Sequence, residues 1–332
     1  MRAVVLTEYG DTEVLRVVEV ADPIAGPEEV LVEVVATALN RADLLQRRGL
    51  YPSPPLAGFP MPAPEIPGME FAGRVLALGE RVTTLAVGDE VMGIVGGGAY
   101  AERLVVHERQ TMRVPSGVEL RDAAAIPEVF ITAYDALVVQ GGLSSGRVAL
   151  VHAGASGVGT AAIQIAGAIG ARVIVTASGG KVAACESLGA DLAIDYTTGD
   201  FVDAALGYTG GDGVDVIVDV IGGDYVNRNL SAIRVGGRII QVGTMGGGRT
   251  DVNIGMLLPK RAAIIGTVLR ARPLEEKIAI TQRFAAEMLP LFDQGRLRPV
   301  IDTRFALDEI AAAHARMESN ANVGKILIDV CD

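Results

Sequence analysis

The sequence contains no tryptophan and only two cysteines, Cys185 and Cys331, among 332 residues. Two cysteines cannot build a disulfide framework or a four-cysteine zinc site. No uninterrupted apolar run is long enough to span a bilayer, and the first ten residues, MRAVVLTEYG, lack the apolar segment of a signal peptide. These absences predict a soluble, cytoplasmic protein in a reducing compartment.

Basic residues are also scarce: 29 lysines and arginines stand against 40 aspartates and glutamates, which gives a net charge of −11. Nucleic acids and anionic membranes attract basic surfaces, so this balance disfavours sequence-independent binding to either, although it is compatible with a local basic pocket. Half of the residues are hydrophobic, which is enough for sizeable cores and argues against disorder. A chain of this length predicts two domains.

The first part of the chain is predicted to be rich in β-strands. Through the first hundred-odd residues, short β-branched segments alternate with Gly, Pro, Asp and Glu, which is typical of a small barrel or sandwich. Residues 51–67, YPSPPLAGFPMPAPEIP, contain seven prolines and are predicted to form a loop. Near its end the chain returns to short strand-like pieces, RPVIDTRFAL and GKILIDV, which we expect to fold back onto the first domain.

From about residue 122 strands and helices alternate. A helical pattern covers 121–142, with a proline near its start. The strands that follow are near-continuous Val/Ile runs, which indicates burial on both faces and therefore a parallel sheet covered by helices. We predict strands at 147–153, 171–177, 191–196, 214–223, 237–243 and 262–269, and helices at 157–169, 181–188, 200–207, 224–234 and 274–293.

The stretch LVHAGASGVGTAAIQIAGAIG, residues 150–170, places five glycines where the first of these strands runs into its helix. Backbone N–H groups and the positive end of the helix dipole attract a phosphate at such a turn, and glycine lets the backbone approach it. The spacing, G-x-x-G-x-G, is by itself compatible with tight helix–strand packing alone. The surrounding βα units favour a dinucleotide site, to which we assign Gly154, Ser156, Gly157, Val158 and Gly159.

The second strand of the sheet ends in VTASGGK, without the Asp or Glu that would accept hydrogen bonds from the ribose 2′-hydroxyl of NAD. Ser178 and Lys181 stand there instead, and both suit a 2′-phosphate. The sequence therefore favours NADPH over NADH. The alternative for Lys181 is a solvated lysine in the first turn of a helix.

The segment HAGASGVGTAAIQ resembles the signature of zinc-independent quinone oxidoreductases of the zeta-crystallin type, within the medium-chain dehydrogenase/reductase superfamily. The resemblance spans essentially the whole sequence and is strongest toward the stress-inducible NADPH:quinone oxidoreductase branch. Further matching segments follow one another in the same order, namely ALNRADLLQRRGLYP, IPGMEFAG, GGGAYAE, AAAIPEVFITAYDAL, DVIGG, GTMGGG and NVGKILI.

This resemblance implies an α/β protein of two domains. A GroES-like β-barrel domain is expected to comprise residues 1–122 and 294–332, and a Rossmann domain with a doubly wound parallel sheet of six strands is expected to comprise 123–293. Nicotinamide and substrate are expected in the cleft between them. The family also implies a homodimer joined through the edge strands of the Rossmann sheets, here the strand within RAAIIGTVL.

One departure separates the chain from zinc-dependent relatives. Where alcohol dehydrogenases hold catalytic zinc with a Cys and a His, this sequence has Asn40 and Met69, and the four structural cysteines are missing. We therefore expect no metal, so that the protein mainly orients NADPH and an electron-poor acceptor. A quinone fits because hydrogen-bond donors can stabilise its reduced oxygens, and an enone has the same polarity.

On the substrate side the family pattern points to Asn40, Asp43 and Tyr51 as catalytic residues. Asn40 offers an amide donor, and Tyr51 offers a ring for stacking and a hydroxyl for hydrogen bonding or proton delivery. The alternative for Tyr51 is a ring anchored at the edge of the proline-rich loop. The alternatives for Asp43 are a helix N-cap and a surface carboxylate.

On the cofactor side the resemblance adds further residues, several of which lie near the carboxyl ends of the strands, where open α/β sheets bind ligands. Each has a structural alternative: a helix hydroxyl for Thr132, a half-buried strand-end ring for Tyr196, simple turns for the glycines, and solvated side chains for Arg270 and Lys325. The added residues, which join Ser178 and Lys181, are Thr132, Tyr196, Gly222, Thr244, Met245, Gly246, Arg270 and Lys325.

The histidines form no catalytic constellation; His152 is predicted to be packed and hydrogen-bonded, and Cys185 to face the core. The first functional hypothesis is an NADPH-dependent quinone reductase that transfers hydride or single electrons. The second is reduction of activated C=C bonds in enones or alkenals. The third is a nucleotide-binding protein with little turnover, in a structural or RNA-binding role.

Overall fold

The computed structural model describes residues 1–51 and 65–331. Contacts between Cα atoms divide the chain into two compact units: unit 1 comprises residues 1–131 and 269–332, and unit 2 is the intervening segment 132–268. The loop predicted for residues 51–67 lies almost entirely outside the described residues.

The division differs from the domain boundaries expected at 122 and 294. Residues 123–131 and 269–293, expected in the Rossmann domain, belong to unit 1. The reason is the packing of helix α9 (Leu274–Asp293). Its Gln282 donates a hydrogen bond to the carbonyl of Arg109 at 2.7 Å, and the rings of Phe130 and Phe292 meet edge to face at 4.9 Å. Helix α9 itself has the predicted bounds.

Unit 2 contains the predicted doubly wound sheet. Its six strands are all parallel and lie in the order β10-β9-β8-β11-β12-β13. Every residue of β8 and β11 is buried, as the Val/Ile runs predict for central strands. The strands are β8 (Val148–Val151), β9 (Arg172–Ala177), β10 (Leu192–Asp195), β11 (Val214–Asp219), β12 (Ile233–Gln241) and β13 (Ala263–Gly266).

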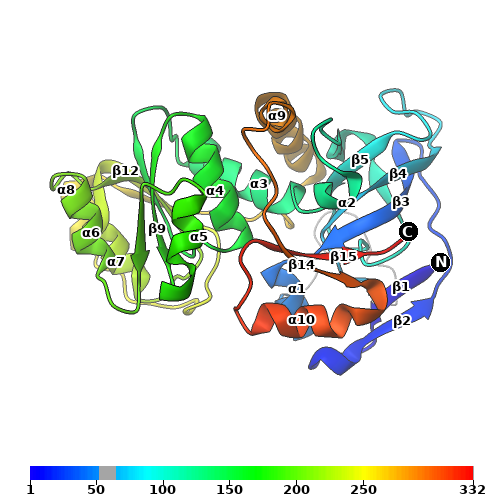
Figure 1. Ribbon diagram of the computed structural model, residues 1–332, viewed down its shortest axis with the longest axis horizontal. Helices are drawn as coiled ribbons and strands as arrows, with labels where there is room; N and C mark the ends of the chain where they lie inside the picture. The colour runs from blue at the N-terminus through cyan, green and yellow to red at the C-terminus, as the bar shows by residue number, and fades with distance from the viewer. Residues whose placement is uncertain (52–64, 332) are drawn as a thin grey trace. The chain divides into compact units, whose positions relative to one another are not determined.

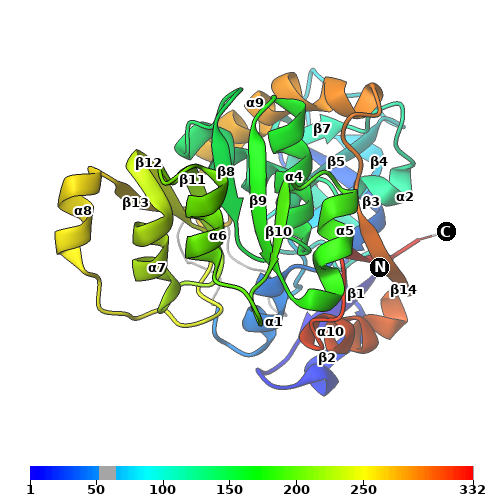
Figure 2. The ribbon, with the colours of Figure 1, turned by 60° about the vertical axis from the view of Figure 1, so that its left-hand side comes forward.

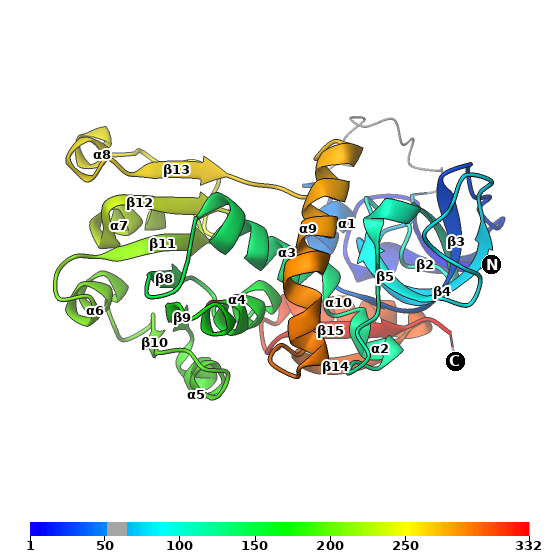
Figure 3. The ribbon, with the colours of Figure 1, turned by 90° about the horizontal axis from the view of Figure 1, so that it is seen from above.

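Helices cover both faces of this sheet. Figure 3 shows α4 on one face and α6 and α7 on the other, which is the arrangement that right-handed crossovers produce on the two sides of a strand-order reversal. The reversal lies between β8 and β11, and Figure 2 shows these strands side by side at the centre of the sheet. The helices of unit 2 are α4 (Gly157–Ala168), α5 (Val182–Ser187), α6 (Phe201–Tyr208), α7 (Tyr225–Ala232) and α8 (Ile254–Lys260).

Unit 1 is built around a seven-stranded sheet to which both ends of the chain contribute. Strand β15 pairs antiparallel with β3, and β14 pairs with β15, as Figure 1 shows for the red, orange and blue segments. This confirms that the C-terminal strands fold back onto the first domain. The strands of unit 1 are β1 (Arg2–Leu6), β2 (Leu15–Glu19), β3 (Glu29–Ala38), β4 (Glu70–Leu78), β5 (Glu90–Ile94), β6 (Arg103–His107), β7 (Thr111–Arg113), β14 (Ile301–Ala306) and β15 (Lys325–Asp329).

The helical pattern predicted over 121–142 is interrupted in the structure. It forms α2 (Leu120–Ala123), α3 (Pro127–Tyr134) and a π-helical segment, Asp135–Gln140. Pro127 cannot donate an intrahelical hydrogen bond, so a new helix begins there. Helices α1 (Arg41–Arg47) and α10 (Ile310–Glu318) lie in unit 1, and the segment 135–140 lies in unit 2. No helix in the described residues combines the length and the apolar character needed to cross a bilayer.

Candidate functional site

The turn between β8 and α4 has no room for side chains at two of its glycines. A Cβ atom on Gly154 would lie 2.6 Å from the Cβ of Val175 in β9, and one on Gly159 would lie 2.4 Å from the carbonyl oxygen of Ala153. Both positions therefore require glycine for the packing of helix against strand. This close packing brings the first turn of α4 to the carboxyl edge of the sheet.

The N-terminus of α4 offers backbone donors at that edge. Ser156 is the N-cap residue, and its hydroxyl oxygen accepts a hydrogen bond from the Gly159 N–H at 3.0 Å. The N–H groups of Gly157 and Val158 precede the first intrahelical hydrogen bond of this 12-residue helix. Together with the positive end of the helix dipole, they suit a phosphate group.

Ser178, Lys181 and Tyr196 lie at the carboxyl ends of two adjacent strands, β9 and β10. Ser178 precedes a short 3-10 turn, and its carbonyl accepts a hydrogen bond from the Lys181 N–H at 2.8 Å. Tyr196 follows β10 directly and is about half exposed, at 51%. The structure thus brings these three predicted residues to one edge of the sheet.

Asp195, which sequence reasoning did not single out, lies at the same place. A Cβ atom on Gly179 would lie 2.5 Å from its Oδ2 atom, so the carboxylate is packed against the 178–181 turn. Hydrogen bonds from the hydroxyl and N–H of Thr197 lower the pKa of Asp195. A carboxylate beside a predicted 2′-phosphate position is a charge that Lys181 has to outweigh.

The turns that follow β11 and β12 are joined to each other. The N–H of Gly223 donates to the carbonyl of Gly247 at 3.1 Å. Gly222 and Gly223 both have positive φ, +68° and +55°, which explains glycine at these two positions without reference to a ligand. The joined turns contain the predicted residues Gly222, Thr244, Met245 and Gly246.

In unit 1, Asn40 belongs to a buried polar network with Glu70 and Lys325. Asn40 Nδ2 donates to Glu70 Oε1 at 2.8 Å, and its Oδ1 accepts from Lys325 Nζ at 2.7 Å. Lys325 Nζ also donates to Glu70 Oε1 at 2.7 Å and to the carbonyl of Leu39 at 2.6 Å. The side chains of Lys325 and Glu70 are 4% and 0% exposed, so the alternative of a solvated Lys325 is wrong.

Glu70 connects three elements of unit 1. Its second carboxylate oxygen accepts a hydrogen bond from the N–H of Glu128 at 2.8 Å, near the start of α3. The first oxygen holds α1, through Asn40, and β15, through Lys325. Nothing in the sequence pattern singled out Glu70, except that a carboxylate in the apolar run GMEFAG has to find partners when it is buried.

Thr132, on α3, is buried at 6% exposure.

Asp43 lies at the third position of α1 and is 1% exposed, so the alternative of a surface carboxylate is wrong. Its Oδ2 atom accepts hydrogen bonds from the Asn40 N–H at 2.8 Å and from the Tyr100 hydroxyl at 2.9 Å. Its Oδ1 atom has no partner among the described residues. Burial raises the pKa of Asp43 to about 6 and raises that of Tyr100 well above its ordinary value.

The raised pKa of Asp43 gives a testable dependence of stability on pH. Because its folded-state pKa of about 6 lies above the unfolded value of about 3.9, its ionisation opposes folding, and its contribution worsens as pH rises from about 4 to 6. In Asp43→Asn, which keeps an acceptor for Tyr100, we expect this loss to disappear. The free energy of unfolding of wild type minus that of the variant should fall by about 2–3 kcal/mol between about pH 4 and pH 7.5.

Urea unfolding followed by circular dichroism at both pH values measures this difference. Asp212→Asn, which removes a carboxylate at an exposed position, supplies the control for the change in net charge. A pH-independent difference for Asp43→Asn would contradict the raised pKa.

Tyr51 and Arg270 lie together in unit 1. The guanidinium carbon of Arg270 is 5.3 Å from the centroid of the Tyr51 ring, and Arg270 Nε donates to the carbonyl of Gly96 at 2.8 Å. Burial raises the pKa of Tyr51 and lowers that of Arg270. Arg270 is 6% exposed, so the alternative of a solvated surface arginine is wrong. The pair presents a phenol and a cation in a partly dehydrated setting.

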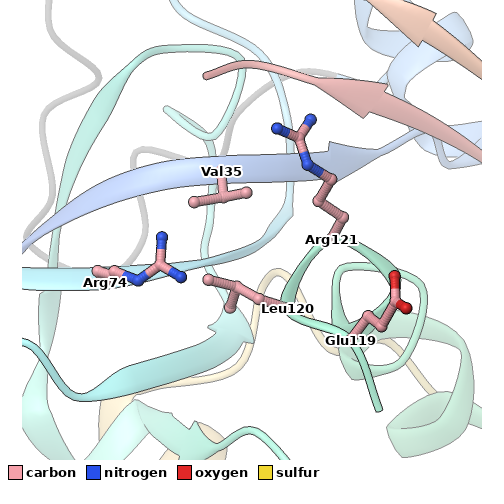
Figure 4. Close-up of a pocket in the computed structure, with 5 residues that line it drawn as sticks. All are labelled: Val35, Arg74, Glu119, Leu120 and Arg121. Atoms are coloured by element: carbon pink, nitrogen blue, oxygen red, sulfur yellow. The ribbon is translucent and has the colours of Figure 1, made fainter. Parts of the chain in front are cut away.

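A pocket of about 250 Å³ lies elsewhere in unit 1, as Figure 4 shows. Its two arginines are ion-paired, Arg74 with Glu90 at 2.8 Å and Arg121 with Asp329 at 3.5 Å. No predicted site residue lines it, and its lining consists of Val35, Arg74, Glu119, Leu120 and Arg121.

Two family models match the chain. The model described as an alcohol dehydrogenase GroES-like domain matches residues 26–116, and the model described as a zinc-binding dehydrogenase matches residues 188–328. The first match lies in unit 1, and the second covers parts of both units.

Full-length relatives give consistent matches. The chain is 33% identical to the human synaptic vesicle membrane protein VAT-1 homolog, over 99% of this chain and 86% of that protein. It is 31% identical to human quinone oxidoreductase, over 99% of this chain and 97% of that protein. It is 30% identical to the 2-methylene-furan-3-one reductase of Solanum lycopersicum, over 99% of this chain and 79% of that protein. The solved structure of Escherichia coli quinone oxidoreductase complexed with NADPH superposes with a TM-score of 0.88 at 28% identity, over 99% and 100%.

Proposed function

Because this chain belongs to the medium-chain dehydrogenase/reductase superfamily, we propose that it is an NADPH-dependent reductase of quinones that works without zinc. A bound NADPH supplies hydride, or single electrons, to the acceptor. The observation that carries the proposal is the turn before α4, where Gly154 and Gly159 admit no Cβ atom at the carboxyl edge of a doubly wound sheet. The similarity to quinone oxidoreductases of human and E. coli supports it further.

The residues of unit 2 fit such a cofactor. The N–H groups of Gly157 and Val158 are suited to the pyrophosphate, and Ser178 and Lys181 are suited to a 2′-phosphate. The half-exposed ring of Tyr196 offers a face beside that position. That the E. coli relative was solved in complex with NADPH supports the choice of nucleotide.

On the substrate side the contacts favour Tyr51 as the residue that touches the acceptor. Its raised pKa keeps the hydroxyl protonated near neutral pH, so it can donate to an oxygen on which negative charge develops. Arg270, over its ring, adds positive charge. The amide of Asn40 is held at both ends by Glu70 and Lys325, so we assign Asn40 and its helix neighbour Asp43 to positioning α1.

Zinc does not fit the residues around Asn40. The Lys325 ammonium lies 2.7 Å from Asn40 Oδ1 and from Glu70 Oε1, so a cation already occupies the polar centre of this network. Met69 offers only a thioether. Among residues 1–51 and 65–331, no group of three or more His, Cys, Asp and Glu side chains is arranged to hold a metal ion.

We therefore expect exhaustive chelation to leave the reductase activity within about 20% of its starting value, since no step needs a Lewis acid. The measurement is the steady-state rate with NADPH before and after dialysis against a chelator. A loss of activity that added zinc restores would overturn the zinc-free assignment.

Steady-state assays with NADPH separate the functional hypotheses. Oxidation of NADPH by 1,4-benzoquinone or 1,2-naphthoquinone, at kcat/KM well above that for enones, is the expected result. The likeness to the tomato reductase favours a second candidate, reduction of an activated C=C bond, which a preference for enones and alkenals would establish. Binding of NADPH without oxidation by either class would support a binding protein with little turnover.

We also propose that the protein is a homodimer joined through β13. This strand pairs only with β12 among the described strands, and an unpaired edge invites pairing with a second copy. Large apolar side chains are exposed on and around it, namely Val252, Ile254, Leu258, Ile264 and Val268. Light scattering of Ile264→Lys against wild type tests this assignment, and an unchanged dimer mass would contradict it.

A further inference from the structure

A buried chain of hydrogen bonds runs through unit 2 beneath the carboxyl ends of its strands. Thr176 Oγ1 lies 3.1 Å from His152 Nδ1, and His152 Nε2 lies 2.8 Å from Asn229 Oδ1. Asn229 Nδ2 donates to Asp219 Oδ2 at 2.8 Å. All four residues are at most 2% exposed. This confirms the packed, hydrogen-bonded role predicted for His152, and it adds two partners, Asn229 and Asp219, that the sequence pattern did not reveal.

The donors and acceptors in this chain have one consistent order. A carboxylate only accepts hydrogen bonds, so the Asn229 amide presents its nitrogen to Asp219 and its oxygen to His152. His152 Nε2 therefore carries a proton, and Nδ1 accepts from the Thr176 hydroxyl. The rings of Phe201 and Tyr225 meet His152 edge to face at 4.7 and 4.8 Å and fix its plane. Burial lowers the pKa of His152, in keeping with a neutral ring.

One end of the chain fixes the turn after β11. Asp219 Oδ1 accepts hydrogen bonds from the N–H groups of Ile221, at 2.6 Å, and Gly222, at 2.9 Å. A hydrogen bond from the Gly223 N–H to the Gly247 carbonyl joins the turn after β11 to the turn after β12.

The other end of the chain of hydrogen bonds fixes the glycine-rich turn between β8 and α4, called the glycine turn below. Thr176 Oγ1 accepts a hydrogen bond from the Ala153 N–H at 3.4 Å, and the Thr176 carbonyl accepts one from the Gly154 N–H at 2.8 Å. Ala153 has a φ of +57°, a conformation that a residue with a Cβ atom adopts only at a cost of about 1 kcal/mol. The chain thus anchors the glycine turn where its backbone is strained.

This chain of hydrogen bonds crosses the point where the strand order of the sheet reverses. His152 follows β8, Asp219 ends β11, and these strands are neighbours whose crossovers leave on opposite faces. In open α/β sheets ligands bind outside the carboxyl ends of the strands at this point. One network therefore contacts both turns that flank the predicted dinucleotide position.

We propose that Asn229 is a positioning residue that couples the glycine turn to the turn after β11, so that the two form one preorganised dinucleotide site. The inference rests on the proposed use of NADPH. Asn229 acts through His152 and Asp219 and itself contacts neither turn. A dinucleotide that spans both turns should depend on the coupling, whereas adenosine 2′,5′-bisphosphate, which needs only the turns after β8 and β9, should depend on it little.

The test breaks the chain of hydrogen bonds by one substitution and then restores it by a second. Asn229→Asp sets two buried carboxylates against each other, and we expect the Kd for NADPH to rise about 10–30-fold while the Kd for adenosine 2′,5′-bisphosphate changes less than about threefold. The exchanged pair Asp219→Asn/Asn229→Asp keeps an acceptor for His152 Nε2 and for the N–H groups of Ile221 and Gly222, and it reverses only the hydrogen bond between positions 219 and 229. We expect it to return the Kd for NADPH to within about threefold of wild type. Calorimetry of both ligands gives these values. Equal losses for the two ligands, or no rescue, would overturn the coupling.

A second measurement needs no ligand and a milder variant. Thr176→Val keeps the shape of the side chain but removes the hydroxyl at the glycine-turn end. In the unliganded protein we expect faster amide hydrogen exchange, by about threefold or more, at Gly222 as well as at Ala153. Faster exchange at Ala153 alone would contradict the coupling. This result does not depend on which nucleotide binds. Failure of wild type to bind NADPH would instead refute the proposed function.

Discussion

Replacing Lys325 by methionine is expected to lower the free energy of unfolding by about 3–5 kcal/mol, because it leaves the carboxylate of Glu70 buried without its cation. Methionine has nearly the length of lysine, so lost packing contributes little. Glu70→Gln removes the opposite partner, leaves the ammonium buried, and should destabilise by a similar amount. Removing both charges together should be far less damaging than the sum of the single changes, since no unpaired charge remains.

The control is an exposed pair of similar geometry in the same unit. Arg74 and Glu90 also lie 2.8 Å apart, but their side chains are 47% and 45% exposed. We expect Arg74→Met to change the free energy of unfolding by less than about 1 kcal/mol. Urea unfolding followed by far-ultraviolet circular dichroism suits a chain without tryptophan. Additive losses in the double variant would show that Glu70 and Lys325 do not act as a buried pair.

Replacing Lys181 by glutamate is expected to raise the Kd for NADPH about 100-fold and to change the Kd for NADH less than about threefold. A charge-assisted hydrogen bond contributes about 1.5–3 kcal/mol, and each 1.4 kcal/mol corresponds to a factor of ten. The variant also sets a second carboxylate beside Asp195, whose packing against the 178–181 turn already places a negative charge there. Both effects act on the 2′-phosphate, which NADH lacks.

Two further variants make the comparison specific. Arg16→Glu, at an exposed position of β2 in unit 1, changes the net charge equally and should leave both dissociation constants unchanged. Asp195→Asn should improve binding of NADPH relative to NADH by about threefold, because it removes the opposing charge. Equal losses of NADPH and NADH in Lys181→Glu would refute the 2′-phosphate role.

The fold was predictable because its signals are local. The buried, mostly apolar runs of β8 and β11 and the glycines between strand and helix recur at short sequence distances, and they predict the observed parallel sheet. The division of the chain by contacts differs from the expected domain bounds at residues 269–293, because an amphipathic pattern shows that a helix packs against something but does not show its partner. Helix α9 has the predicted bounds and packs in unit 1.

The site was predictable in position more than in role. Family motifs led to Asn40 and Lys325, but not to the carboxylate of Glu70 that binds both. Glu70 and Lys325 are 255 residues apart in sequence, so no periodicity connects them. Asp219 and Asn229 were missed for another reason: each is ordinary for its element, and only the geometry at His152 reveals what they share.

The pairing of β15 with β3 sets the order in which this protein can be completed on the ribosome. Lys325 reaches the carbonyl of Leu39 across 286 residues, a length that takes roughly 15–60 s to synthesise. Unit 2 is contiguous in sequence and can fold as it emerges from the ribosome. One edge of β3 remains unpaired along residues 36–38 until β15 has been synthesised. The nascent chain therefore carries an unfinished apolar sheet through most of its synthesis, the kind of intermediate that chaperones protect.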